Sequence, residues 1–161
     1  MAHWLMKSEP SVYSIDDLRR DGSTSWGGVR NYQVRNMFRD DFHPGDTAFF
    51  YHSGCDVPGI VGVMQVKGRA YPDPTQFDPR SGYHDPRSRP DAPAWLAVDV
   101  KFQRKLKRTV TLEELRGEPA LADMLVLRRG SRLSVTPVDP GQWDLILALA
   151  QGPPGPSHRN D

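Results

Sequence analysis

The segment from residue 25 to residue 36, SWGGVRNYQVRN, holds the residue types best suited to bind a nucleobase. A Trp ring is a good stacking surface for a base, and Arg and Asn have donors and acceptors that match base edges. Adjacent glycines let a backbone approach a ligand, and a helix that begins after them presents free N–H groups to a phosphate. The same pattern also fits a core Trp26 followed by a solvated helix face, so residue types alone leave both interpretations open.

A basic run is the second candidate for contact with nucleic acid. It holds five cations within eight positions: Lys101, Arg104, Lys105, Lys107 and Arg108. Such a run can bind phosphates, but it can equally be a solvated strand end and loop. Three further cations flank the next expected strand and could extend the same surface: Arg128, Arg129 and Arg132.

The sequence gives little support for catalysis or metal binding. A Gly-rich phosphate loop, a dinucleotide fingerprint and a Gly-x-Ser-x-Gly motif are all missing. Cys55 could pair with His52 or His84, but nothing marks its thiol as activated. His52 and Cys55 have half of a zinc-site spacing, and there is no second Cys to complete it. We therefore expect no catalytic residue, no metal and no organic cofactor.

The composition bounds the class of protein. The 161 residues suffice for one domain, and 37% hydrophobic and 25% charged residues are typical of a soluble globular chain. The formal net charge of +1 favours no particular partner. A single Cys excludes an intramolecular disulfide and favours a reducing compartment. Signal-peptide and membrane-span patterns are absent, so we expect a cytoplasmic protein, or a nuclear one in a eukaryote.

Short strands and short helices must position the candidate residues. Patterns of apolar residues predict strands at residues 2–6, 47–52, 60–66, 95–102 and 132–138. Helices are predicted after Ser14, over 32–39, after Thr111 and after Asp139, where capping boxes, an amphipathic repeat or a Pro at the first helical position occur. Without regular crossover helices, a small closed or nearly closed barrel of the α+β class fits better than a doubly wound parallel sheet.

Two stretches fall outside this pattern. The Pro-rich stretch from 71 to 93 predicts one long surface loop. The Pro- and Gly-rich residues 152–161 predict a disordered tail, which leaves residues 1–151 as the single domain.

Five motifs resemble those of the EVE domain family, which belongs to the PUA-like superfamily. They are MKSEP at 6–10, GVRNYQVRN within 26–36, FFYHS at 49–53, GIVG at 59–62 and RGSRLSVTP at 129–137. The resemblance covers about residues 2–150, and the motifs are too long and too numerous for a chance match. Val34 stands where the family motif would have Ala, a departure that should affect only packing.

The resemblance implies a PUA-like mixed β-barrel of about five or six strands with short peripheral helices. It also implies a central aromatic-walled pocket like that of the YTH readers of methylated adenine, with Trp26 as its stacking wall. The residues expected at the base pocket are Lys7, Ser8, Glu9, Trp26, Val29, Arg30, Asn31, Arg35, Tyr51, His52, Ser53, Arg132, Leu133 and Ser134.

The expected function is therefore that of a non-catalytic reader of nucleic acid, DNA or RNA. It would accommodate one base, methylated or hydroxymethylated cytosine or adenine, and would act as a monomer away from membranes. One alternative is an amidohydrolase that acts on acetylcytidine. Some ASCH-type members of the same superfamily resemble such enzymes, and Lys7, Ser8 and Glu9 could form the reactive set here. Strand alternation argues against it, because residue 8 should point away from residues 7 and 9. The other alternative is a protein-interaction adaptor with no ligand.

Overall fold

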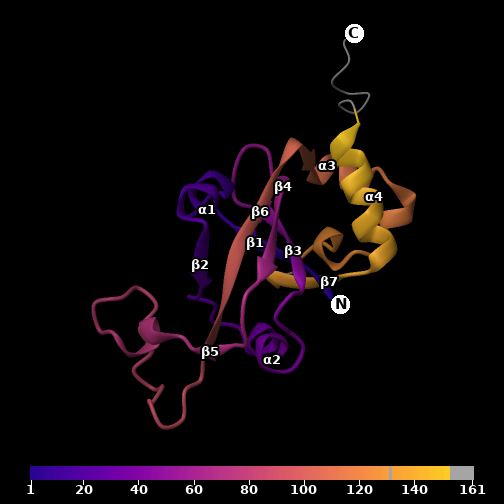
Figure 1. Cartoon of the computed structure of the whole chain (residues 1–161). Coiled ribbons are helices and arrows are strands. Elements are labelled where there is room, and N and C mark those ends of the chain that lie inside the picture. The colour runs from indigo at the N-terminus through magenta and orange to yellow at the C-terminus, as the bar shows by residue number, and fades with distance from the viewer. Residues whose placement is uncertain (131, 153–161) are drawn as a thin grey trace.

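The computed structural model describes residues 1–130 and 132–152, which form one mixed sheet with helices packed around it (Figure 1). The seven strands of this described part are β1 (His3–Ser8), β2 (Ser23–Trp26), β3 (Thr47–His52), β4 (Gly59–Val66), β5 (Tyr71–Pro72), β6 (Leu96–Thr111) and β7 (Val135–Val138). Their order is β2-β6-β4-β3-β1-β7, and the short β5 pairs with β6. β1 and β3 are parallel, and the other pairs are antiparallel.

Four α-helices accompany the sheet in the described residues: α1 (Ile15–Asp21), α2 (Tyr32–Asp40), α3 (Leu112–Arg116) and α4 (Pro140–Gln151). Short 3-10 turns are η1 (Pro74–Phe77), η2 (Pro119–Leu121) and η3 (Leu125–Leu127). The predicted capping boxes at Ser14 and Thr111 are confirmed by reciprocal side-chain bonds with Asp17 and Glu114. These caps satisfy backbone N–H groups that the first helical turn leaves unpaired.

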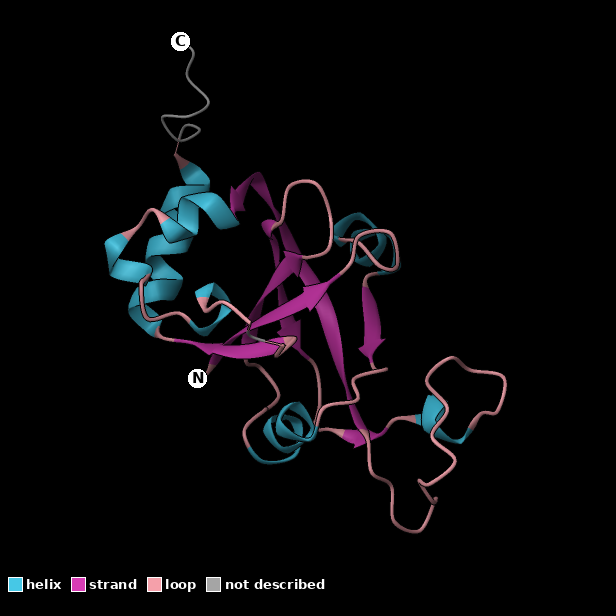
Figure 2. Cartoon of the chain, turned by 180° about the vertical axis from the view of Figure 1, so that it is seen from behind, coloured by secondary structure: helices cyan, strands magenta, loops and turns pink. Residues whose placement is uncertain are grey.

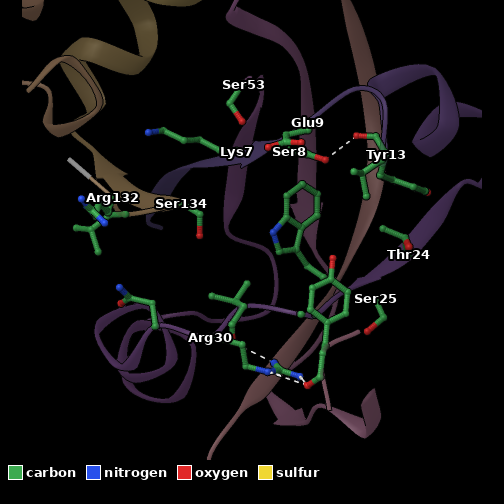
Figure 3. Close-up of a pocket in the computed structure, with 18 residues that line it drawn as sticks. Lys7, Ser8, Glu9, Tyr13, Thr24, Ser25, Arg30, Ser53, Arg132 and Ser134 are labelled. Carbon is green, nitrogen blue, oxygen red and sulfur yellow. Dashed lines mark hydrogen bonds between the residues drawn. The ribbon is translucent and has the colours of Figure 1, made fainter. Parts of the chain in front are cut away.

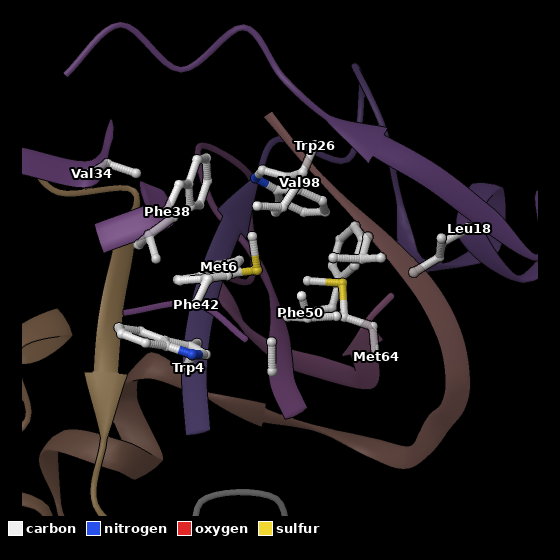
Figure 4. Close-up of a cluster of buried hydrophobic side chains, with 14 of the residues drawn as sticks. Trp4, Met6, Leu18, Trp26, Val34, Phe38, Phe42, Phe50, Met64 and Val98 are labelled. Atoms are coloured by element: carbon white, nitrogen blue, oxygen red, sulfur yellow. The ribbon is translucent and has the colours of Figure 1, made fainter. Parts of the chain in front are cut away.

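Two hydrophobic clusters lie on opposite faces of the sheet, because side chains alternate along each strand. In β1, Trp4 and Met6 enter the first cluster, whereas Leu5 enters the second. α1 and α2 cover the first cluster, which Figure 4 shows around Phe38, Phe42 and Phe50. α3 and α4 cover the second, whose members include Leu115, Trp143 and Ile146. Val34 is fully buried in the first cluster, so the departure at this position is a change in packing.

Strand limits differ from the prediction where polar residues continue a ladder. β1 extends to Ser8 because Lys7 and Ser8 pair with Tyr51 and His52 of β3. β6 runs through the whole basic run because β4 pairs with it as far as Thr111. The predicted strand from 132 to 138 was too long, since β7 begins at Val135. β2 was not predicted, because its sequence STSW has a single apolar residue.

The stretch from 71 to 93 is not the single loop that its prolines predicted. It contains β5 and η1, and it projects from the sheet beyond β5 (Figure 2). The fully buried Gln76 side chain fixes its two ends together, since Nε2 donates to Asp73 O and Trp95 O and Oε1 accepts from Trp95 N–H.

α4 ends at Gln151, and Gly152 is its C-cap. The Gly152 N–H donates to Leu149 O, which satisfies one of the last carbonyl groups of the helix. The rest of the predicted disordered tail, residues 153–161, lies outside the described residues. None of the helices in the described part of the chain is long and apolar enough to cross a membrane.

Candidate nucleic-acid interface

A pocket of about 770 Å³ lies between the two edges of the sheet. β2 borders it from one edge, and the segment that leads into β7 borders it from the other. The sheet therefore curves and stays open along a seam, and the pocket fills that seam. Its lining residues are Lys7, Ser8, Glu9, Val12, Tyr13, Thr24, Ser25, Trp26, Gly27, Gly28, Val29, Arg30, Asn31, Ser53, Tyr83, Arg132, Leu133 and Ser134.

The pocket has two polar walls (Figure 3). Lys7, Arg132 and Ser134 lie on one side, while Tyr13, Thr24 and Ser25 lie on the other. The backbone bond from Lys7 N–H to Ser134 O, 2.8 Å long, ties the first wall together. The first wall thus joins segments far apart in the sequence, because β1 pairs with the segment that leads into β7.

Trp26 belongs both to the core and to the pocket. Its side chain is 8% exposed and packs edge-on against Phe50, with ring centroids 5.4 Å apart. The same residue lines the cavity. The sequence left two interpretations open for Trp26, and the structure combines them: a buried ring that also borders the pocket.

Lys7 brings a positive charge to the pocket wall. It is half-buried, and loss of water around the ammonium lowers its pKa below the usual value. Its Nζ makes no hydrogen bond or ion pair with any residue that the structure describes. Glu9 directly follows the last residue of β1, and its side chain packs on Gly54. The wall therefore offers a cationic donor and a carboxylate acceptor to a ligand.

Lys7, Ser8 and Glu9 all line the pocket, so the strand alternation expected to turn residue 8 away is wrong here. The reason is that β1 ends at Ser8 and the chain turns. The Ser8 hydroxyl donates to Tyr13 O over 2.6 Å, which fixes the turn.

Three residues expected at the base pocket do not line it. Arg35 donates from Nη1 to Ala94 O and lies over the Tyr32 ring. Tyr51 is buried in the second cluster, and burial raises its pKa to about 12. His52 accepts a bond from Ile15 N–H at Nε2, 3.1 Å away. Alternation along β3 turns Tyr51 into the second cluster, and the bond to Ile15 holds His52 at the start of α1. Ser53, beyond the strand end, lines the cavity.

Seven lining residues were not predicted for the pocket: Val12, Tyr13, Thr24, Ser25, Gly27, Gly28 and Tyr83. Thr24 and Ser25 belong to the strand that lacked a sequence signal. The paired glycines were expected from the sequence to let the backbone approach a ligand, and both glycines line the pocket. Nothing in the sequence indicated that Tyr83 would return to Gly28 across more than fifty residues.

The basic run divides into paired and unpaired cations. Arg108 forms a two-point ion pair with Glu114, 2.6 and 2.7 Å long, and also donates to Leu149 O. Lys105 pairs with Asp16 at the surface. Arg108 is thus a structural residue and not a free phosphate ligand. Within the basic run, three exposed cations have no ion pair among the described residues: Lys101, Arg104 and Lys107, here named the unpaired cations.

Other reactive groups are scattered. Cys55 is a partly exposed free thiol. Among the residues that the structure describes, no group of three His, Cys, Asp or Glu side chains could hold a metal ion.

Comparison with known proteins gives consistent matches over almost the whole chain. The family model described as the EVE domain matches residues 2–149. Thymocyte nuclear protein 1 of Homo sapiens is 42% identical over 95% of this chain and 76% of that protein. A crystal structure of a Pseudomonas putida protein is 48% identical, covers 92% of this chain and 99% of that one, and has a TM-score of 0.90.

A crystal structure of human THYN1 protein in complex with 5-methylcytosine-containing DNA is also similar. It is 42% identical, covers 96% of this chain and 100% of that one, and has a TM-score of 0.87. An ASCH protein of Zymomonas mobilis is only 10% identical with a TM-score of 0.59, and that likeness concerns the fold alone. The α+β, PUA-like fold predicted from the sequence is confirmed, and the chain belongs to the EVE domain family.

Proposed function

We propose that this protein is a DNA-binding reader that accommodates a single modified base in the seam pocket. The observation that carries the proposal is the pocket itself, where a Trp edge and polar walls meet. Its volume lies within the roughly 300–1,000 Å³ typical of ligand sites. The related human protein, crystallised with DNA that contains 5-methylcytosine, supports a modified cytosine as the ligand.

In this proposal, Trp26 stacks on or borders the base, and the groups of the polar walls read its edge. Lys7 donates to a carbonyl or ring nitrogen, and Glu9 accepts from an exocyclic amine. A methyl group fills apolar space that an unmodified base leaves empty. One such group changes binding by roughly 1–3 kcal/mol, so discrimination should be about 10- to 200-fold.

The test is a binding panel. Duplexes that each carry one 5-methylcytosine, one 5-hydroxymethylcytosine, one N6-methyladenine or no modification are titrated by fluorescence anisotropy, with matched RNA. We expect the tightest binding to a modified-cytosine DNA, with one protein per modified base, as for a monomer. Equal affinity for the unmodified duplex would show that the pocket does not read the modification.

Hydrolysis of acetylcytidine is a second candidate, because Lys7, Ser8 and Glu9 do share one pocket. The Ser8 hydroxyl, however, is occupied by its bond to Tyr13 O, which a free nucleophile would not be. Incubation with acetylcytidine, followed by mass spectrometry, separates the two functions. A reader leaves the nucleoside intact, and multiple turnovers to cytidine would make this protein an enzyme.

A further inference from the structure

The segment that begins with β5 and ends before β6, residues 71–95, returns to the pocket and is held there by a buried carboxylate. Asp73 is 1% exposed. Its carboxylate accepts from Gly28 N–H at 2.7 Å, from Thr75 N–H at 2.9 Å and from Arg30 Nη1 at 3.0 Å. A buried carboxylate with this many donors fixes the loop firmly against the glycine turn at the pocket floor.

Arg30 uses its whole guanidinium to hold this segment. Nε and Nη2 donate to Tyr83 O at 3.1 and 2.6 Å. Nη2 also donates to Thr75 Oγ1, while Nη1 donates to Asp73 and to Val29 O. A guanidinium has five N–H groups, and these five bonds occupy all of them. Arg30 therefore has no donor left for a phosphate or a base.

Tyr83 is the residue that this clamp presents to the cavity. The residue is 48% exposed and lines the pocket, so it contributes little to the core. It lies directly on Gly28, where an added Cβ would meet ring atoms at 2.9 Å. The Arg30 guanidinium lies over the ring at 5.7 Å. An exposed aromatic ring held in place at the rim of a pocket is preorganised for contact with a ligand.

We propose that Tyr83 is a second ring contact for the bound nucleotide and that Arg30 is the positioning residue that keeps it there. This inference rests on the proposed function and adds a specificity-determining residue to it. The base would then meet one aromatic surface from β2 and another from the 71–95 segment. Because the clamp exists before binding, little ordering of the loop is needed when DNA arrives.

The first test compares Tyr83→Ala with Tyr83→Phe for binding to the 5-methylcytosine duplex. Loss of a stacking ring should weaken binding on the order of 10-fold or more, whereas Phe keeps the ring and should bind like the parent. Equal binding by Tyr83→Ala would overturn the inference. Loss in both variants would assign the contact to the hydroxyl and would equally overturn the ring contact.

The second test addresses the clamp with Arg30→Lys, which keeps the charge but has only three donors on one atom. We expect weaker binding together with faster hydrogen exchange in residues 73–88 than in the rest of the chain. Unchanged exchange would remove Arg30 from the positioning role.

Gly28→Ala supplies a third test, and Gly22→Ala is its matched control. Both glycines have a positive φ, +75° and +80°, so both variants carry similar backbone strain. Only Gly28 has the Tyr83 ring against it, whereas an added Cβ at Gly22 meets nothing within 4 Å. We expect Gly28→Ala to weaken binding and Gly22→Ala to leave it unchanged. In a protein that already carries Tyr83→Ala, the added Gly28→Ala should weaken binding much less. Equal effects of the two glycine variants would contradict the inference.

These outcomes separate the inference from the proposed function. If a Trp26 variant loses binding while Tyr83→Ala does not, the pocket reads a base without the second ring. If the parent protein binds none of the duplexes, both proposals fall together.

Discussion

Trp26 is shared between the first hydrophobic cluster and the pocket, so any substitution there acts on both stability and binding. Trp26→Ala should lower the free energy of unfolding by about 3–5 kcal/mol, as loss of a buried ring does. Binding to the modified duplex should weaken by roughly 1–3 kcal/mol in the fraction that stays folded.

Phe42→Ala is the matched control for this experiment. Phe42 lies in the same cluster, is 1% exposed and stacks on Trp4, but does not line the pocket. The Phe42→Ala variant should be destabilised to a similar degree. Below its melting temperature, it should bind DNA as tightly as the parent does. If both variants lost affinity equally, the effect of Trp26 would be one of stability only.

His52 links the stability of α1 to pH. Its Nε2 accepts the Ile15 N–H bond and must be unprotonated to do so. Burial, the main cause, lowers its pKa in the folded state below the usual 6.5. The unfolded chain therefore binds more protons as the pH falls through 6.5, so stability is greatest above that value and declines below it.

Urea unfolding at several pH values between 5 and 8 measures this dependence, and His52→Gln is the comparison. The Gln amide oxygen can still accept the Ile15 bond but does not titrate. The part of the acid-induced loss that belongs to His52 should vanish in this variant. Identical pH profiles for parent and variant would contradict the assignment.

At the scale of elements, Arg108 and Glu114 join β6, α3 and the end of α4. Their side chains are 17% and 15% exposed, and the ion pair has two short bonds. Glu114→Gln should lower the free energy of unfolding by about 2 kcal/mol, since hydrogen bonds to charged groups contribute roughly 1.5–3 kcal/mol. Thermal unfolding should show a melting temperature lower by about 4–8 °C.

Asp16→Asn is the control, because Asp16 pairs with Lys105 at the surface, where the side chains are 66% and 44% exposed. Exposed pairs contribute about 0–1 kcal/mol, so its melting temperature should change little. Equal destabilisation by the two variants would mean that burial does not set the strength of these pairs.

The sequence predicted the elements that carry a local signal. The caps at Ser14 and Thr111 and the aromatic strand from 47 to 52 were located correctly, because periodicity and capping are encoded within a few residues. β2 and the end of β6 exist only because distant strands pair with them, and local propensity does not report that. Pocket residues that lie in the family motifs could be predicted from the sequence. The position of Tyr83 could not, because it depends on the conformation of a loop that buried polar contacts hold in place.

At the scale of the whole molecule, the net charge of +1 provides little general attraction to DNA, so phosphate contacts must be local. The unpaired cations Lys101, Arg104 and Lys107 are the members of the basic run that can supply them. Lys101 is paired in register with Ser23 at the start of β2, the strand that reaches the pocket through Trp26. Phosphates on either side of a base held in the pocket could therefore meet this strand pair.

Replacing all three unpaired cations by Gln should flatten the dependence of binding on salt. Each lost phosphate contact changes the slope of log K against log salt by about 0.9 on duplex DNA, so the triple variant should change it by roughly one to three units. Arg39→Gln, which removes a cation paired with Asp40 on α2, should leave the slope unchanged. Titrations at four salt concentrations give the slopes. An unaltered slope in the triple variant would return the basic run to an ordinary solvated strand. DNA would then be held by the pocket wall, where Lys7 and Arg132 have no ion pair with any residue that the structure describes.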